Sequence, residues 1–214
     1  MAPYEDKRFA EREGLQRKTQ AANLPVVDEN TASPEVRQLY QRFREGFGRP
    51  QVPGILQCFA THPPLLEHML GLAKDMLFVD GALGRQNKEL ISAFVSASNR
   101  CAYCADSHAC SFRMQGGAQA TVRAVLACDL ESEHITPQQR TLLEFARKIT
   151  QDSQALTPTD IDCMRASGWG DLQIAEAIHV TALFATFNRV VNAFGLPSQH
   201  LLDAFEQEET SHGR

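Results

Sequence analysis

Residues 100–110 read RCAYCADSHAC, so two cysteines stand three positions apart and a histidine follows four positions after the second. Positions separated by three, four and seven residues lie on one face of an α-helix. A helix that begins near Cys101 would therefore direct Cys101, Cys104 and His108 into common space. The free N–H groups and the positive dipole end at a helix start stabilise a thiolate, which is the nucleophilic form of cysteine. The stretch thus predicts a thiol site on the opening turns of a helix, with a histidine able to take the thiol proton.

A glutamate that precedes this stretch in the sequence is a candidate partner for His108. Residues 85–99, RQNKELISAFVSASN, carry apolar residues around much of a helix surface, which is typical of a well-buried helix. Glu89 lies near its start, twelve residues before Cys101. A carboxylate there could orient His108 and relay its proton. The alternative is a solvated first-turn carboxylate with no part in the chemistry.

Apolar residues recur at helical spacing along the rest of the chain, and no segment makes a convincing strand. Three helix starts carry a capping residue followed by proline at the first helical position: Ser33-Pro34, Thr136-Pro137 and Thr157-Pro158. We therefore predict an all-α protein, a bundle of roughly eight to ten helices. The expected organisation is a polar N-terminal arm over residues 1–24, one helical domain over residues 25–206 and a polar tail over residues 207–214.

Length, charge and the N-terminus narrow the class of protein. The chain has 214 residues, which suits one domain with a single core. Its net charge of −5 is spread along the sequence, without the clustered lysines and arginines of a nucleic-acid surface. No apolar run approaches the roughly 20 residues that span a bilayer, and the charged N-terminus lacks the apolar segment of a secretory signal. We expect a cytoplasmic protein with no nucleic-acid or membrane partner, whose six cysteines stay reduced.

The spacing of Glu89, Cys101, Cys104 and His108 resembles the Glu…Cys-x-x-Cys-x-x-x-His core of the AhpD-like alkyl hydroperoxidases, within the carboxymuconolactone decarboxylase-like fold. The stretches VPGILQCFATHPPLL (52–66) and NRCAYCADSHACSFRMQGG (99–117) particularly resemble the branch of peroxidase-related proteins. The specific motif covers residues 89–117, and a looser likeness in length and helix order covers about residues 25–200.

This resemblance implies a thiol-dependent peroxidase. Cys104 would attack a small hydroperoxide, Cys101 would resolve the product as a disulfide, and His108 would act as the base with Glu89 as the distal member of the relay. The resemblance also implies no haem, flavin or metal cofactor, electrons from an external thiol or lipoyl-type reductant, and a homo-oligomer, either a trimer or a hexamer. The best-known AhpD proteins carry a second histidine between the cysteines, where this chain has Tyr103, so we expect a relay that differs at this position.

Several alternatives remain open for the motif. Cys101 and Cys104 could be two buried structural thiols, or they could bind zinc with His108 and Glu89, although structural zinc sites usually draw their ligands from loops. The same fold supports a carboxymuconolactone decarboxylase-like lyase, which needs no cysteine pair. A disulfide oxidoreductase without peroxidase activity and a non-catalytic redox scaffold are further candidates. Tyr103 either lines the pocket or packs in the core.

The four remaining cysteines have no comparable neighbours in the sequence. We expect each of them to be a small buried apolar residue without a part in the chemistry: Cys58, Cys110, Cys128 and Cys163.

Overall fold

The computed structural model describes residues 22–212 as an all-α fold, and that part of the chain holds no strand. The predicted fold class is confirmed. In chain order the helices are α2 (Pro34–Phe47), α3 (Gly54–Phe59), α4 (Pro63–Met76), α5 (Arg85–Ser98), α6 (Ala102–Met114), α7 (Gln119–Leu126), α8 (Pro137–Asp152), the short 3₁₀ helix η1 (Ser153–Ala155), α9 (Pro158–Ala166), α10 (Asp171–Phe194) and α11 (Leu201–His212).

The helix starts predicted from capping residues are confirmed. The Ser33 hydroxyl accepts the backbone N–H of Val36 at 3.2 Å, and α2 begins with proline directly after this cap. At α8 the hydroxyl of Thr136 accepts the N–H of Gln139, whose side chain accepts the N–H of Thr136 in return. Each cap satisfies N–H groups that have no partner inside the helix, which is why the sequence fixes these boundaries locally.

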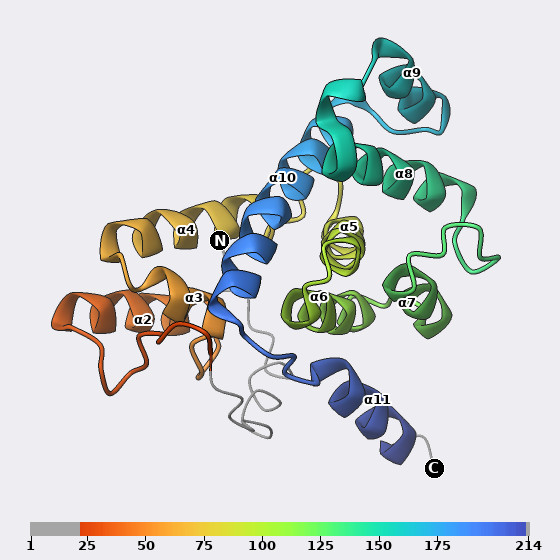
Figure 1. Ribbon diagram of the computed structural model, residues 1–214. Coiled ribbons are helices and arrows are strands. Elements are labelled where there is room, and N and C mark those ends of the chain that lie inside the picture. Colours follow the sequence, from red (N-terminus) through yellow and green to blue (C-terminus); the bar gives the residue numbers. More distant parts are fainter. Residues whose placement is uncertain (1–21, 213–214) are drawn as a thin grey trace.

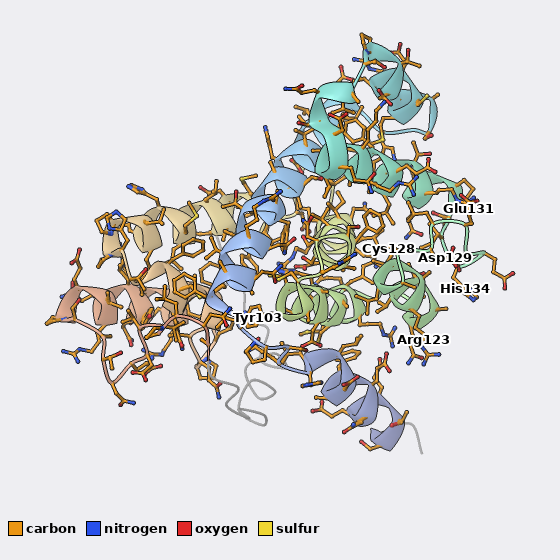
Figure 2. The ribbon with its side chains drawn as sticks, viewed as in Figure 1. Tyr103, Arg123, Cys128, Asp129, Glu131 and His134 are labelled. Atoms are coloured by element: carbon orange, nitrogen blue, oxygen red, sulfur yellow. The ribbon has the colours of Figure 1, made fainter. Side chains whose placement is uncertain are left out.

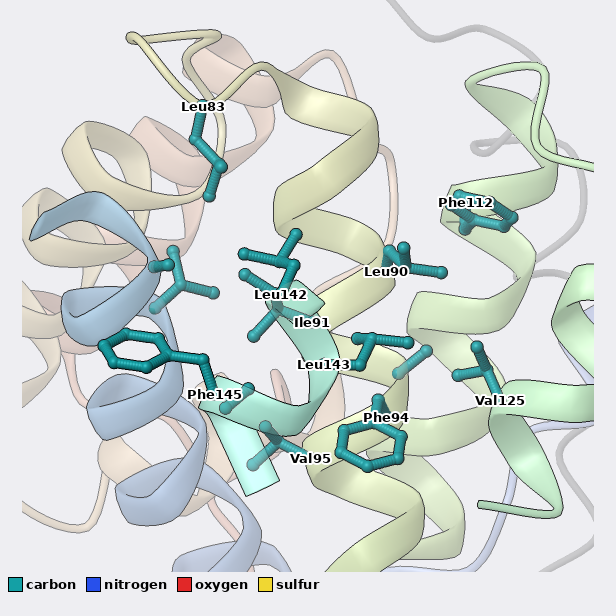
Figure 3. Close-up of a cluster of buried hydrophobic side chains, with 14 of the residues drawn as sticks. Leu83, Leu90, Ile91, Phe94, Val95, Phe112, Val125, Leu142, Leu143 and Phe145 are labelled. Atoms are coloured by element: carbon teal, nitrogen blue, oxygen red, sulfur yellow. The ribbon is translucent and has the colours of Figure 1, made fainter. Parts of the chain in front are cut away.

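Helix α10 runs through the middle of the fold, with α2, α3 and α4 on one side and α5, α6, α7 and α8 on the other (Figure 1). On the α5 side a large apolar core joins α5 and α8 to α6, α7 and α10 (Figure 3). A second core joins α2, α3 and α4 to the opposite face of α10. Phe184 belongs to the first core, and Leu183 and Phe187 belong to the second. Because both of its faces are covered, α10 must be apolar around much of its circumference.

Contrary to the expectation that no apolar run approaches the length of a membrane span, α10 is long and apolar enough to cross a membrane by length and hydropathy alone. Half of its most apolar stretch is buried inside the protein, as in the core helix of a helical bundle.

Helix α11 lies apart from the cores and packs on α6. The carboxylate of Asp106 on α6 accepts the N–H groups of Leu201 and Leu202, both at 3.0 Å, and so caps the start of α11. Leu201 and Phe205 cover Cys110. The domain end expected at residue 206 falls inside this helix, which continues to residue 212. Most of the expected N-terminal arm lies outside the described residues.

Candidate active site

The cysteine pair sits where the chain turns from α5 into α6. Arg100 takes a left-handed conformation with φ of 54°, and the N–H of Cys101 closes the turn on the carbonyl of Ser96 at 2.9 Å. Cys101 is the residue before the first turn of α6, and Cys104 lies within that turn. The helix therefore begins where the sequence predicted it, and its free N–H groups adjoin both sulfurs.

The two thiols lie in one buried cluster, and each affects the pKa of the other. A hydrogen bond from the Cys104 thiol lowers the pKa of Cys101 against the opposing effect of burial, and the backbone N–H of Cys104 and the Asn188 side chain lower it further. The pKa of Cys104 is raised well above its ordinary value by its interaction with Cys101 and by its own burial. Of the two thiols, Cys101 is therefore the easier to ionise.

The cysteine with the raised pKa, Cys104, is the one that a small molecule can reach. Cys104 lines a cavity of about 90 Å³, whereas Cys101 lies behind it with no exposed surface. Tyr103 and His108 lie on the same wall, so Tyr103 takes the pocket-lining position that the sequence left open. The opposite walls come from α2, α3, α4 and α10 and are apolar and rich in aromatic rings: Phe43, Phe47, Phe59, Met69, Leu70 and Phe187. A small molecule that enters this cavity meets Cys104 first.

The histidine and the carboxylate form a buried relay beside the cavity. Nδ1 of His108 lies 2.6 Å from Oε2 of Glu89, and the rings of His108 and Phe184 pack in a T-shaped arrangement with 4.5 Å between their centroids. Glu89 is completely buried, so the solvated-carboxylate alternative is wrong. Because Nδ1 of His108 is bonded to Glu89, Nε2 is the ring nitrogen that can exchange a proton with a group in the cavity.

The sequence reasoning missed Arg85, which neutralises this buried carboxylate. Its Nε donates to Oε1 of Glu89 at 2.6 Å, its second guanidinium nitrogen forms an ion pair with the same oxygen, and its guanidinium carbon lies 4.6 Å from the centroid of the Phe78 ring. Burial alone would raise the pKa of Glu89, but the charges and hydrogen bonds of Arg85 and His108 outweigh it and hold this pKa below its ordinary value. The signal available in the sequence was the spacing of four residues between Arg85 and Glu89.

The carboxylate oxygens that Glu89 would offer to zinc are already hydrogen-bonded. Both oxygens of Glu89 are taken by Arg85 and His108. Within residues 22–212, no group of three or more His, Cys, Asp or Glu side chains is arranged to hold a metal ion.

The other cysteines divide into two classes, so the expectation that all four are buried is wrong for two of them. Cys58 and Cys110 are buried, and burial raises the pKa of Cys58 to about 12, which keeps it a thiol. Cys128 and Cys163 are exposed. Figure 2 places Cys128 at the loop after α7, away from Tyr103 on the motif helix. Cys128 follows the end of the short helix α7, and Cys163 lies on an exposed face of α9.

Residues 63–148 match the sequence profile of the carboxymuconolactone decarboxylase family. Among curated proteins, the uncharacterized protein YdfG of Bacillus subtilis (strain 168) is 24% identical over 114 residues, which are 53% of this chain and 77% of YdfG.

Two solved structures share the fold. An uncharacterized peroxidase-related protein from Ralstonia eutropha JMP134, described as an alkylhydroperoxidase AhpD core, superposes with a TM-score of 0.75 at 24% identity, over 86% of this chain and 95% of that one. The debrominase Bmp8, as its C82A variant in complex with 2,3,4-tribromopyrrole, superposes with a TM-score of 0.69 at 16% identity, over 89% of this chain and 98% of that one.

Proposed function

Since residues 63–148 match the profile of the carboxymuconolactone decarboxylase family and the fold is similar to that of an AhpD core, we propose that this chain is a member of that family and a thiol-dependent peroxidase that reduces small hydroperoxides. The observation that carries the proposal is the order of the two thiols at the cavity. Cys104 faces the cavity together with His108, and the fully buried Cys101 packs in the same cluster as Cys104. A substrate-facing thiol with a second thiol in reach is what a two-cysteine peroxidase requires.

In the first step the sulfur of Cys104 attacks the distal oxygen of the hydroperoxide, and the O–O bond breaks. The proton of Cys104 leaves to Nε2 of His108 as the sulfur attacks, and His108 passes a proton to the departing alkoxide, which becomes an alcohol. Cys104 becomes a sulfenic acid. Glu89 keeps His108 oriented and stabilises its charged form, and Arg85 keeps Glu89 ionised.

In the second step the thiolate of Cys101 attacks the sulfur of Cys104. A disulfide forms between them and hydroxide leaves, taking a proton to become water. The lowered pKa of Cys101 suits it to this step, because a lower pKa makes the attacking thiolate easier to form. An external dithiol then reduces the disulfide by exchange and is itself oxidised to a disulfide. Overall, one hydroperoxide and two thiols give one alcohol, one water and one disulfide.

The cavity favours a small substrate over a protein disulfide. Cys104 is only 3% exposed and is reached through a cavity of about 90 Å³, so the disulfide of a folded partner would not approach it without a rearrangement. This argues for peroxidase activity over a general disulfide oxidoreductase. A lyase would not need the sulfur pair at all. The cytoplasmic location, the external reductant and the trimeric or hexameric assembly stay predictions from the sequence.

The test is to reduce the protein, add one equivalent of hydrogen peroxide or cumene hydroperoxide, and locate the oxidised cysteines by peptide mass spectrometry. We expect a disulfide between Cys101 and Cys104. Cys104→Ser should abolish this disulfide and peroxide consumption, whereas Cys101→Ser should leave a sulfenic acid on Cys104 that a dimedone probe traps. Cys163→Ser, which removes an exposed thiol far along the chain, is the matched control and should consume peroxide like the wild type. Free Cys101 and Cys104 thiols after peroxide treatment would refute the proposal.

The aromatic lining of the cavity also favours a second candidate, the reductive removal of a halogen from a small aromatic ring. The same two thiols could supply two electrons, so that the halogen leaves as halide, a proton takes its place on the ring and a disulfide forms. The debrominase with 2,3,4-tribromopyrrole is a fold relative. Incubating the reduced protein with a tribromopyrrole tests this candidate. The measurement is bromide release, and Cys104→Ser is the negative control.

A further inference from the structure

A second hollow lies next to the cavity that holds Cys104, which we call the reaction cavity. Helices α2 and α4 lie on the same side of α10 (Figure 1), and a groove of about 360 Å³ runs between them. Phe43, Phe47 and Leu70 line this α2–α4 groove, and the same three residues also line the reaction cavity. One layer of side chains, which we call the partition, therefore separates the two spaces.

Aromatic rings continue from the groove into the reaction cavity. The rings of Phe43 and Phe47 stack with 4.9 Å between their centroids, and Phe47 meets Phe78 edge to face at 5.0 Å. Phe78 in turn lines the reaction cavity. An apolar group of a ligand would thus lose contact with water on either side of the partition, which favours its binding in both spaces.

Glycines on both helices leave the groove open. Gly46 of α2 and Gly71 of α4 line it, and a Cβ added to either residue would meet no atom within 4 Å. Glycine is a poorer helix former than alanine, and neither residue has the positive φ that would require glycine. What the two glycines provide is space, because side chains at these positions would begin to fill the groove.

The volumes decide what the reaction cavity can hold by itself. It measures about 90 Å³, whereas an apolar cavity of about 150 Å³ holds one benzene molecule. Hydrogen peroxide therefore fits beside Cys104 without the groove, but a hydroperoxide that carries an aromatic ring does not. The α2–α4 groove offers the missing volume on the far side of the partition.

We propose that the α2–α4 groove is a second chamber of the substrate site, which takes the apolar organic group of a hydroperoxide, and that the partition sets the size of substrate that reaches Cys104. Rotation of the half-buried Leu70 joins the two spaces, so that the peroxide group lies at Cys104 and the organic group lies in the groove. The wall from α2 lies outside residues 63–148, so the match to the family profile does not supply this chamber. The inference rests on the proposed thiol chemistry and names the substrate class of the same site.

The experiment compares the rate constants with which hydrogen peroxide and cumene hydroperoxide oxidise the reduced protein in a single turnover. Gly71→Phe fills the groove at a position where the Cβ is unhindered, so the variant should fold. We expect the ratio of the cumene hydroperoxide rate constant to the hydrogen peroxide rate constant to fall at least about tenfold, because even one methylene in an apolar pocket changes such a ratio by about 10–200-fold.

Leu72→Phe is the matched control for the added ring. Leu72 is the next residue of α4, is exposed and lines neither the groove nor the reaction cavity, so this variant should keep the wild-type ratio. Leu70→Ala tests the partition in the opposite direction: it shortens one of the three side chains and should raise the ratio. If Leu70→Ala does not fold, Gly71→Phe still decides the question.

A second measurement needs no peroxide. Iodoacetamide and the bulkier N-phenylmaleimide both alkylate thiols, and mass spectrometry of fragment ions gives the rate at which each reagent labels Cys104 in the reduced protein. Relative to iodoacetamide, N-phenylmaleimide should label Cys104 more slowly in Gly71→Phe and faster in Leu70→Ala.

The outcomes separate this inference from the proposed function. If Gly71→Phe keeps the wild-type ratios in both measurements, or if Leu72→Phe changes them equally, the groove takes no part and the inference is wrong. If the two alkylating reagents respond as expected but neither hydroperoxide oxidises the wild type or any variant, the groove stands as a chamber of the Cys104 site and the peroxidase proposal fails.

Discussion

Replacing Arg85 by methionine tests the electrostatics of the buried relay. Methionine keeps an unbranched side chain against Phe78 and removes the charge that neutralises Glu89. Glu89 has no exposed surface, so water cannot replace the lost partner. His108 stays bonded to the other carboxylate oxygen and keeps part of the compensation.

The expected loss of stability follows from this geometry. Breaking a buried ion pair by removing one partner costs about 3–5 kcal/mol. Because His108 remains, we expect the lower end, about 3 kcal/mol at neutral pH. For a chain of this size each kcal/mol corresponds to about 2–4 °C, so the midpoint of thermal unfolding should fall by about 6–12 °C.

The pH dependence identifies the cause. In the wild type the pKa of Glu89 is lowered, so its charge stabilises the fold above the unfolded pKa, and this contribution is lost as the pH falls through the folded pKa. Without Arg85, burial pushes the folded pKa of Glu89 upward. The variant therefore protonates Glu89 at a higher pH than the wild type does. The stability difference should be largest at neutral pH and should shrink as the pH falls.

The assay is urea unfolding followed by the helical circular dichroism signal, at neutral and mildly acidic pH and at one protein concentration. Arg147→Met is the matched control, because Arg147 makes an exposed pair with Glu144 at 3.9 Å and should change the stability by less than about 1 kcal/mol. A loss in Arg85→Met that does not change with pH would refute the electrostatic reasoning and assign the effect to packing on Phe78.

Two further substitutions test the framework of the fold. Thr136→Ala removes the hydroxyl that caps α8 and should cost about 1 kcal/mol, measured by urea unfolding, with no effect on peroxide consumption. Gly117→Ala would place a Cβ 2.1 Å from the buried ring of Phe112, so it should cost about 1–3 kcal/mol. A thermal midpoint equal to that of the wild type would contradict this close approach of Gly117 to Phe112.

The helices themselves were readable from the sequence. Ser33 and Thr136 satisfy N–H groups within three residues of themselves, and the spacing of Cys101, Cys104 and His108 fixes their common side on α6 once the helix exists. Those interactions depend on a few neighbouring residues, so a local pattern is enough to predict them.

The exposure of Cys128 and Cys163 could not be predicted from the sequence. Each is a small apolar side chain, and whether such a residue faces a core depends on which segments cover its helix.

By itself, therefore, the sequence determined an all-α chain with a thiol pair and a histidine on the opening turns of one helix. Tertiary structure decided which sulfur faces the cavity, which carboxylate is buried away from water and which amide joins α10 to the end of α5. Asn188 meets Ser96 and Asn99 across 92 and 89 residues of chain. The physical reason is that hydrogen-bond patterns within a helix act over a few residues, whereas exclusion of water, which sets the strength of every charge and donor at this site, exists only once distant helices have packed.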